Sequence, residues 1–413
     1  MKKLYDITGR LLLVGVLVSC NGNHPPESHF PVDTVHRKGT YGYDLDFIQK
    51  NSRQVLELHD SSGQSKILLC ASYQGRVLTS TASGDTGSSF GWINYDLISS
   101  GQTRQAFNPY GGEERFWIGP EGGQYSFYFK KGDSFNIRSW RVPGLIDTAS
   151  YRIVRSSAGE AEFQKDARIT NYSGTIFEIS ITRKVRLLDK PSIEEKIQTS
   201  IPDKIRYVGF ESSNQIANSG NEAWTREKGL MSIWLLGMMT PTPQTKVFIP
   251  FRSKPDARSY ITDNYFGIVP ADRLLEKDSI LYFRCDGAYR SKIGISPKIA
   301  KPIAASFDFS RNILTLLFPE VQPDGSYVNS KWEMQKHPFE GDVINSYNDG
   351  PLQDGSQLGP FYEIESSSPA RELRPGESEG YRQTTCHFQG DYDSLRKMVL
   401  HLMKVDLDEI KKW

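Results

Sequence analysis

The 413-residue sequence has no excess of charge of either sign, because 50 Lys and Arg residues are balanced by 49 Asp and Glu residues. A basic excess is the usual mark of a protein that binds nucleic acid or an anionic membrane surface, so the balance favours neither partner. The sequence also has no glycine-rich dinucleotide motif, no P-loop, no His-Glu-x-x-His motif and no paired Cys-x-x-Cys motif. We therefore expect no nucleotide cofactor, no structural zinc and no nucleic-acid partner.

Histidines and cysteines are both scarce. No histidine occurs between His59 and His337, so the commonest general acid–base side chain is missing from the middle of the chain. Beyond the N-terminal segment the cysteines are Cys70, Cys285 and Cys386, an odd number whose spacing matches no disulfide framework. We expect them to be small buried core residues, with one disulfide as the alternative in an oxidising compartment.

The sequence has no apolar run long enough to cross a bilayer as a helix, and its one N-terminal run is short. Residues 11–18 are apolar, follow a basic segment and end at a small residue, which is typical of a secretory signal. Residues 17–20 resemble a bacterial lipobox, which implies cleavage before Cys20 and a lipid on that cysteine. We expect a signal peptide over 1–19, a flexible tether over 20–34, and a protein lipid-anchored in the bacterial envelope, at the outer membrane facing the periplasm.

The remaining chain has the composition of a β-protein. Aromatic residues make up 12% of the sequence, with 35 Gly and 22 Pro, which indicates many short strands joined by turns. Apolar or alternating segments recur roughly 10–20 residues apart, with no amphipathic helix between them. These segments are 55–58, 66–70, 115–118, 176–181, 184–188, 205–211, 231–238, 247–251, 280–284 and 313–318. The pattern predicts one all-β domain of stacked antiparallel sheets over residues 35–413, in which the first two segments form a hairpin.

Two segments depart from the strand pattern. Leu395, Val399 and Leu402 follow helical spacing, and Asp391 or Asp393 is available as N-cap, so we expect one amphipathic helix over about 391–411. Residues 42–48 are consistent with either a helix or a strand.

Residues 336–369 combine acidic, amide and aromatic side chains. Glu363 and Glu365 lie two apart in a predicted strand, so they share one face at a separation of roughly 6.5–7 Å. The preceding loop contains Asn345, Tyr347 and Asn348, which suit hydrogen bonding to a polyhydroxyl ligand. The alternative is an exposed edge strand whose acids are solvated.

A second polar stretch occupies residues 108–123, where glycine and proline turns bracket a strand over 115–118. Arg115 and Trp117 share one face of this strand, and Glu121 sits in the turn that follows. The alternative is a tight hairpin with Trp117 in the core and Arg115 at the surface. Asn108 and Glu114 add polar groups, so we expect residues 108–121 and 336–365 to meet in one polar cleft that binds carbohydrate.

A cation site is a further alternative for the same acids. Asp342, Asp349, Glu363 and Glu365 could gather around a hard cation such as calcium, although their grouping is only one of sequence. No EF-hand loop is present. We therefore expect no cofactor, with calcium as the exception to test.

The late strand resembles a motif of a known family. In aldose 1-epimerases (galactose mutarotases) the catalytic base is a Glu on a late strand, within a Leu-Glu-Thr-Gln-like pattern that is followed by a proline. Residues 362–365 and Pro369 are similar to that pattern, with Glu363 at the position of the base. Residues 111–121 and 345–350 resemble mutarotase-like lipoproteins of unknown function from Bacteroides-type organisms. The resemblance implies a galactose mutarotase-like β-supersandwich with a carbohydrate site on a concave face.

The resemblance also implies roles for individual residues. Mutarotation needs a base for the proton of the anomeric hydroxyl and an acid for the ring oxygen. True mutarotases use histidines from the middle of the chain, which are missing here. Glu363 is then the expected base, and Glu121, Arg115, Tyr347 or His337 would replace the acid; we single out Glu121 and His337 as catalytic candidates.

Three functions remain open. The first is an enzyme that acts on a sugar by acid–base chemistry, as an aldose 1-epimerase-like isomerase or a related lyase. The second is a non-catalytic glycan-binding lipoprotein that uses the same groove, with Trp117 or Trp332 stacked on a pyranose face. The third is a structural envelope protein without a ligand. Convergence of Glu363, Glu121 and Arg115 in one cleft favours the first two.

Overall fold

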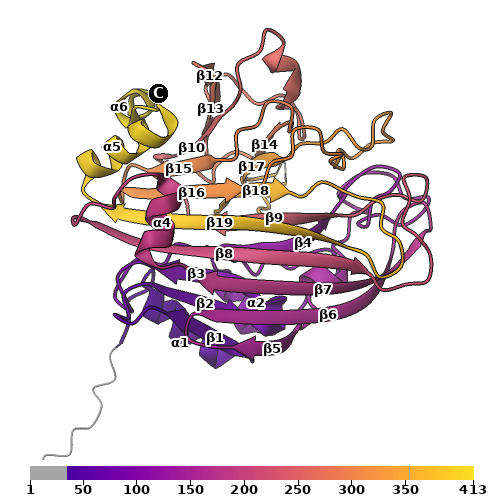
Figure 1. Cartoon of the computed structure of the whole chain (residues 1–413), viewed down its shortest axis with the longest axis horizontal. Coiled ribbons are helices and arrows are strands. Elements are labelled where there is room, and N and C mark those ends of the chain that lie inside the picture. The colour runs from indigo at the N-terminus through magenta and orange to yellow at the C-terminus, as the bar shows by residue number, and fades with distance from the viewer. Residues whose placement is uncertain (1–34, 353) are drawn as a thin grey trace, which may run out of the picture. The chain divides into compact units, whose positions relative to one another are not determined.

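The computed structural model describes residues 35–352 and 354–413, of which His36–Trp413 form one compact unit. The predicted signal peptide, the tether and Cys20 lie outside the described residues. Within the described part no helix is long and apolar enough to cross a membrane. Neighbouring strands pair antiparallel in three sheets (Figure 1).

The three sheets differ in size, and neighbouring strands in each of the following orders are hydrogen-bonded to each other. The ten-stranded sheet contains β12 (Leu274–Lys277), β13 (Ile280–Arg284), β10 (Thr245–Pro250), β15 (Ala304–Asp308), β16 (Ile313–Pro319), β19 (Ser378–Gly390), β8 (Ile205–Asn218), β7 (Ile176–Leu187), β6 (Glu160–Thr170) and β5 (Arg152–Ser156). The six-stranded sheet contains β11 (Ile261–Thr262), β14 (Ser291–Ile295), β17 (Ile344–Asn348), β18 (Tyr362–Ser367), β9 (Ser232–Met239) and β4 (Arg115–Gly119). The three-stranded sheet contains β1 (Val55–His59), β2 (Lys66–Cys70) and β3 (Arg76–Thr81).

The smaller sheets pack against one face of the ten-stranded sheet. In β7 the side chains of Phe177, Ile179 and Ile181 are buried, while those between them are exposed or half-buried. They belong to one core cluster with Ile233 of β9 and Val77 of β3. Because alternate strand residues point to opposite faces, one face of β7 forms the interior of the sandwich. The predicted all-β architecture of stacked antiparallel sheets is therefore confirmed.

The helices are short and lie outside the sheets. They are α1 (Tyr41–Asn51), α2 (Tyr95–Ser100), α3 (Gly144–Asp147), α4 (Lys190–Ile197), α5 (Tyr392–Met403) and α6 (Leu407–Lys412), with 3₁₀ turns at Ala71–Tyr73 and Ala257–Tyr260. Helices α4, α5 and α6 share a second core cluster with β10, β15, β16 and β19, so they cover the outer face of the large sheet (Figure 1). Helix α1, over residues whose sequence allowed helix or strand, packs with α2 on the three-stranded sheet.

The predicted C-terminal helix is present but divided. The Asp391 side chain caps α5 by accepting a hydrogen bond from the Ser394 backbone N–H at 3.0 Å. The helix ends at Lys404, whose φ of 59° is left-handed, and a new helix starts after the cap residue Asp406. One continuous helix over 391–411 was thus wrong in this detail. Helix α4 was missed, because its eight residues are too few to set up a clear periodicity.

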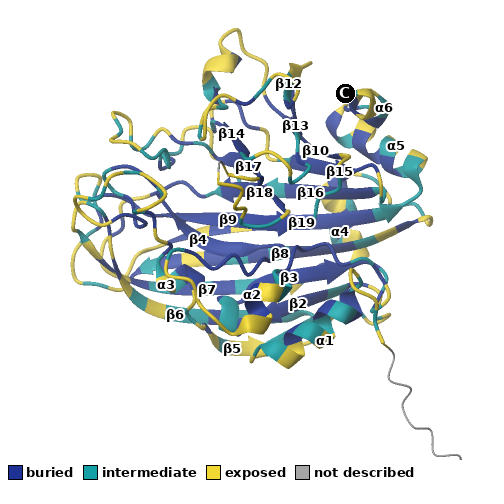
Figure 2. Cartoon of the chain, turned by 180° about the vertical axis from the view of Figure 1, so that it is seen from behind, coloured by how far each residue is buried: buried dark blue, intermediate teal, exposed yellow. Residues whose placement is uncertain are grey.

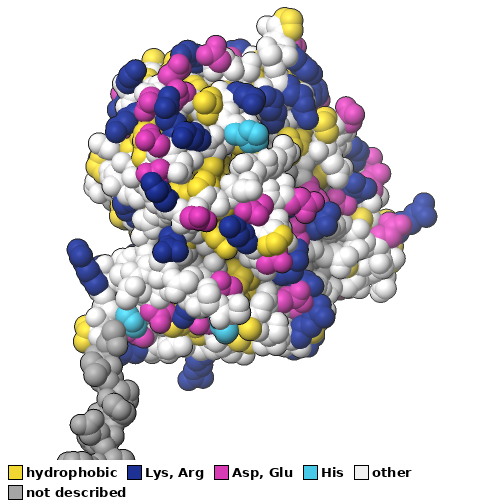
Figure 3. Space-filling model, turned by 60° about the vertical axis from the view of Figure 1, so that its left-hand side comes forward, with side chains coloured by type: hydrophobic (Ala, Val, Ile, Leu, Met, Phe, Trp, Pro, Cys, Tyr) yellow, Lys and Arg dark blue, Asp and Glu magenta, His cyan; other side chains and the backbone are white. Residues whose placement is uncertain are grey.

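Other local expectations agree with the fold. Strands β1 and β2 form the predicted hairpin. Cys70, Cys285 and Cys386 are free and buried, as expected. Most strands are mainly buried, whereas the edge strand β5 and the loops at the strand ends are mostly exposed (Figure 2). On the face shown in Figure 3, basic and acidic side chains are interspersed over the surface.

Candidate functional site

The candidate site lies on one face of the six-stranded sheet. Strand pairing places two rows of side chains on this face. The first row is Lys292, Tyr347, Glu363 and Met238, on β14, β17, β18 and β9. The second row, two residues along, is Asn345, Glu365, Leu236 and Arg115, on β17, β18, β9 and β4. Since side chains two apart share a face, the sheet itself brings the two glutamates together with two cations.

Loops close over this face and leave a cavity of about 300 Å³, called the cleft below. Its aromatic lining residues are Phe107, Trp117, Trp140, Trp234, Phe266, Trp332, Tyr347 and Phe361. Its charged lining residues are Arg104, Arg115, Glu121, Arg290, Lys292, Asp349, Glu363 and Glu365. The expected meeting of residues 108–121 and 336–365 is observed, but aromatic side chains make the walls less polar than predicted.

Glu121 reaches the cleft because two loops that are distant in sequence are joined. The Glu121 backbone N–H donates to Ser330 Oγ at 3.2 Å, and Gln124 exchanges side-chain and backbone hydrogen bonds with Gln335. The loops also touch at Gly122, where a Cβ would lie 2.2 Å from the Lys331 carbonyl oxygen. Only glycine permits this approach. The junction sets Glu121 beside the indole of Trp332, with which it forms a side-chain hydrogen bond.

Arg115 and Glu363 form a buried ion pair at the base of the cleft. The Arg115 Nη2 donates to Glu363 Oε1, and the two side chains are 2% and 7% exposed. Burial raises the pKa of Glu363 to about 8, because the loss of water opposes its charge more than Arg115 supports it. Burial likewise raises the pKa of Glu121, although Lys292 opposes the shift. Two carboxyl groups of the cleft thus hold their protons more tightly than usual.

Lys292 and Glu365 form a second buried pair. The Lys292 Nζ and the Trp234 Nε1 both donate to Glu365 Oε2, at 2.8 and 3.0 Å. Burial by itself would lower the pKa of Lys292, but the carboxylates of Glu365 and Glu121 raise it above its ordinary value. Lys292 therefore stays charged, and Glu365 is held by two donors.

The geometry rejects two alternative readings of these stretches. Strand β18 lies between β17 and β9, and Glu363 and Glu365 are 5% and 1% exposed, so it is not a solvated edge strand. Arg115 is also buried rather than at the surface, with its guanidinium 4.8 Å from the Trp117 ring centre. Trp117 itself is part of both the core and the cleft wall, packed edge-on against Trp234 at 5.6 Å.

Some predicted site residues lie elsewhere. His337 is exposed, does not line the cleft and lies 3.4 Å from the carboxylate of Glu340. Asn108 is fully buried behind the cleft, where its Nδ2 donates to Asp147 Oδ2 at 2.7 Å. The Asn108 side chain also accepts from the Arg104 backbone N–H at 2.7 Å and donates to the Arg104 carbonyl at 3.0 Å, so it holds the preceding loop instead of a ligand.

Strand alternation places two more candidate site residues on the face of their strands that does not line the cleft. Glu114 precedes Arg115 and points into the sandwich, where it pairs with Arg183 at 2.8 Å. Asn348 follows Tyr347 and donates to the Tyr289 carbonyl at 2.9 Å. Asn345 is on the correct face but is occupied by hydrogen bonds to the Ile293 carbonyl and the Tyr265 hydroxyl, both at 3.2 Å.

Several cleft residues were not singled out from the sequence. Lys292 is the one charged residue of the buried strand β14, and Arg290 directly precedes that strand. An isolated charge in an apolar strand is a signal that could have been used, since such charges need a partner. Trp140 and Phe266 come from irregular loops and carry no such signal. Trp234 was assigned only to a buried strand.

The described residues contain no group of three or more His, Cys, Asp or Glu side chains arranged to hold a metal ion. Of the four acids considered for calcium, Glu363 and Glu365 pair with cationic side chains. Asp342 accepts a hydrogen bond from the Tyr265 hydroxyl at 2.7 Å, and Asp349 accepts one from the Tyr347 hydroxyl at 2.6 Å.

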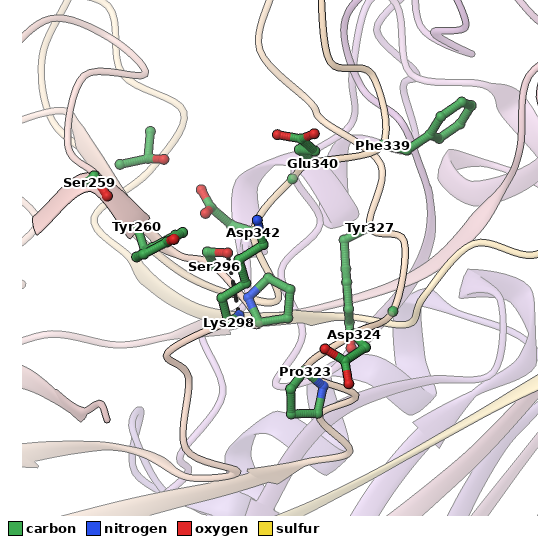
Figure 4. Close-up of a pocket in the computed structure, with 14 residues that line it drawn as sticks. Ser259, Tyr260, Ser296, Lys298, Pro323, Asp324, Tyr327, Phe339, Glu340 and Asp342 are labelled. Atoms are coloured by element: carbon green, nitrogen blue, oxygen red, sulfur yellow. Dashed lines mark hydrogen bonds between the residues drawn. The ribbon is translucent and has the colours of Figure 1, made fainter. Parts of the chain in front are cut away.

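A second cavity of about 390 Å³ adjoins the loop that precedes β17 (Figure 4). Its lining includes Tyr260, Ser296, Tyr327 and Asp342, which are labelled in the picture. The stretch 336–365 is therefore divided, because its first part lines this second cavity and its later part lines the cleft.

Comparison with known proteins identifies the family. The model of a family of unknown function, DUF6786, matches residues 39–413. The chain belongs to this family. A search of curated proteins with the sequence of this DUF6786 member finds no match.

Solved structures that resemble this DUF6786 member in fold include galactose mutarotase-like proteins. The galactose mutarotase-like protein from Lactobacillus casei is 9% identical, with a TM-score of 0.45 over 81% of this chain and 99% of that chain. The galactose mutarotase related enzyme from Lactobacillus acidophilus is 8% identical, with a TM-score of 0.43 over 82% and 97%. The Slr1438 protein from Synechocystis is 10% identical, with a TM-score of 0.49 over 82% and 96%. Similarities this distant carry no conclusion about activity or ligand.

Proposed function

We propose that this protein binds a carbohydrate in the cleft. The observation that carries the proposal is the joint lining of one cavity by four indole rings and three glutamates, Glu121, Glu363 and Glu365. A sugar ring has apolar faces that suit flat aromatic surfaces and hydroxyl groups that suit carboxylates and cations. A mostly apolar pocket with a few convergent polar groups is also the usual form of a small-molecule site.

We further propose that the cleft performs acid–base chemistry of the aldose 1-epimerase kind. Ionised Glu363 takes the proton of the anomeric hydroxyl while protonated Glu121 gives its proton to the ring oxygen. The bond between the ring oxygen and the anomeric carbon breaks, and ring closure on the other face reverses both proton transfers. The pKa of Glu363, which burial raises to about 8, supports its role, because a catalytic group works best with a pKa near the working pH. Burial also raises the pKa of Glu121, which favours the protonated form that an acid needs.

Non-catalytic glycan binding is the second candidate. It is favoured by the two buried ion pairs, Arg115 with Glu363 and Lys292 with Glu365, which hold both carboxyl groups in fixed positions without any need for proton transfer. The two candidates differ in turnover and share the ligand class. Exchange NMR on free sugars separates them, because only the enzyme accelerates interconversion of the anomers.

Trp332 provides the test of binding. Its side chain is half-buried and stacks on Trp140 with ring centres 5.9 Å apart, so its removal should weaken ligand contact without opening the core. We expect Trp332→Ala to reduce affinity for the sugar that binds wild type best by roughly tenfold, or about 1.4 kcal/mol. A glycan array and titration calorimetry measure this.

The matched control for Trp332→Ala is Trp413→Ala, because Trp413 is also half-buried but packs near the C-terminal helices. We expect its affinity to equal that of wild type. Equal affinity of Trp332→Ala and wild type would contradict the proposed cleft, and a wild type that binds no saccharide would contradict carbohydrate binding altogether.

We also propose that the mature protein is a lipoprotein of the bacterial envelope, anchored at Cys20 in the outer membrane and facing the periplasm. The lipobox-like residues 17–20 support this. We expect Cys20→Ala to move the protein from the membrane fraction to the soluble fraction, since no described helix could hold it there. Cell fractionation with metabolic lipid labelling measures this, and an unlabelled wild type in the soluble fraction would refute the anchor.

A further inference from the structure

The cleft contains cations that the protein itself does not neutralise. Four basic residues line it, Arg104, Arg115, Arg290 and Lys292. Arg115 and Lys292 form ion pairs with Glu363 and Glu365. Among the described residues neither Arg104 nor Arg290 has a carboxylate within ion-pair distance.

Arg290 is held in place without using the end of its side chain. Its guanidinium carbon lies 3.8 Å from the ring centre of Phe266, and its Nε donates to the Tyr347 hydroxyl at 3.2 Å. Tyr347 in turn donates to Asp349 Oδ1 at 2.6 Å, which fixes the hydroxyl. Neither Nη group of Arg290 donates a hydrogen bond to another described residue. A stacked arginine with a free end is suited to an oxyanion, two of whose oxygens it can bind through parallel hydrogen bonds.

Unsatisfied donors elsewhere in the lining point the same way. The Arg115 Nε and Nη1, the Trp117 Nε1 and the Trp140 Nε1 are buried and have no hydrogen-bond partner among the described residues. Among the buried cleft atoms that the structure describes, the one acceptor without a partner is Glu365 Oε1. Since buried donors without partners are costly, this excess of donors favours a ligand rich in acceptor oxygens.

Burial weakens the charge that the acids of the cleft set against its cations. Burial raises the pKa of Glu363 to about 8, and it also raises the pKa of Glu121 and of Asp349. Glu363 is therefore only partly ionised at neutral pH, whereas the guanidinium group of arginine keeps its charge.

We infer that the ligand of the cleft is an acidic saccharide, whose carboxylate or sulfate group is bound by the free Nη groups of Arg290. The inference rests on the proposed carbohydrate function and adds the substrate class to it. In this arrangement Arg290 contacts Tyr347, and Tyr347 is the cross-strand neighbour of Glu363. The bound anion is therefore separated from the acid–base residue Glu363 by one side chain, that of Tyr347. Arg290 is thus a specificity-determining residue and not a catalytic one.

The test compares saccharides that differ only in charge. Wild-type protein is titrated with an oligogalacturonate, with the same oligosaccharide fully methyl-esterified, with a sulfated galactan oligosaccharide and with its unsulfated form. We expect at least one acidic ligand to bind tenfold or more tightly than its neutral counterpart, and to lose that advantage in high salt. Preference within the first pair identifies a carboxylate and within the second a sulfate.

Variants locate the anion. Arg290→Gln should abolish the preference for the acidic ligand and leave the affinity for the neutral one within about twofold, whereas Arg290→Lys, which keeps the charge without the planar fork, should keep part of it. Arg374→Gln, an exposed arginine outside the cleft lining, is the control and should behave as wild type. Thermal melts verify that each variant is folded.

The possible outcomes distinguish a failure of the acidic class from a failure of carbohydrate binding itself. Equal binding of the acidic and neutral saccharides overturns the acidic class but leaves carbohydrate binding in place. A charge preference that survives in Arg290→Gln overturns the role of Arg290. A wild type that binds none of the four saccharides overturns both the acidic class and the proposed function.

Discussion

Glu363→Gln is expected to abolish turnover while leaving sugar binding nearly unchanged. The amide keeps the size of the side chain and can still accept a hydrogen bond from Arg115, but it can neither take nor give the proton. Loss of one general acid–base group costs about 10²–10⁴-fold in rate. Exchange NMR on anomers measures the rate, and calorimetry measures affinity.

The pH dependence of the wild-type rate provides an independent test of Glu363 as the base. The base must be ionised, and the ionised fraction of Glu363 grows as pH rises through its pKa of about 8. The rate should therefore rise with pH from pH 6 towards pH 8 as long as Glu121 keeps its proton, and fall once Glu121 loses it, because the mechanism needs Glu363 ionised and Glu121 protonated. A base with an ordinary pKa would give a flat profile in this range.

The control for Glu363→Gln is Glu340→Gln, an exposed carboxylate near His337 that does not line the cleft. It should have the wild-type rate and the wild-type profile. If Glu363→Gln keeps its turnover, the acid–base role is wrong. If wild type binds sugar but shows no turnover at any pH, the non-catalytic candidate replaces it.

Among the variants proposed for this protein, Arg183→Met is expected to cause the largest loss of stability, roughly 3–5 kcal/mol in the free energy of unfolding. Arg183 and Glu114 are both fully buried between the sheets, 2.8 Å apart. The arginine also donates to the Gly75 carbonyl and to Asn214 Oδ1, at 2.9 and 2.7 Å. Its removal leaves a buried carboxylate without its cation, which is costly because no water can replace the partner. Urea unfolding measures the change.

The same strand supplies the control for Arg183→Met. Arg186 also pairs with a glutamate, Glu211 at 3.4 Å, but both side chains are partly exposed to solvent. Arg186→Met should change stability by about 0–1 kcal/mol, because water screens such pairs. Adding Glu114→Gln to Arg183→Met should restore part of the loss by removing the unpaired charge. Equal losses in the two single variants would show that burial of the Arg183 pair does not matter.

Much of the fold was predictable because its signals are local. The alternation of apolar side chains in 176–181 predicts which side chains of β7 are buried. Asp391 marks the start of α5, because its side chain caps the helix. The division of the C-terminal helix at Lys404 was not predictable from spacing, because a left-handed residue other than glycine or asparagine leaves little mark in the sequence.

The sequence by itself determined that Glu363 and Glu365 share one face of a strand, and that Arg115 and Trp117 share one face of another, because alternation needs only the chain. Only the tertiary structure decided that these two faces are the same face of one sheet, where Arg115 meets Glu363 across 248 positions of sequence. It also decided which side of each strand lines the cleft, and so separated Arg115 from Glu114. Periodicity predicts which side chains share a face of a strand. Their burial, and with it the pKa of a carboxyl group, depends on which distant segments of the chain pack over that face.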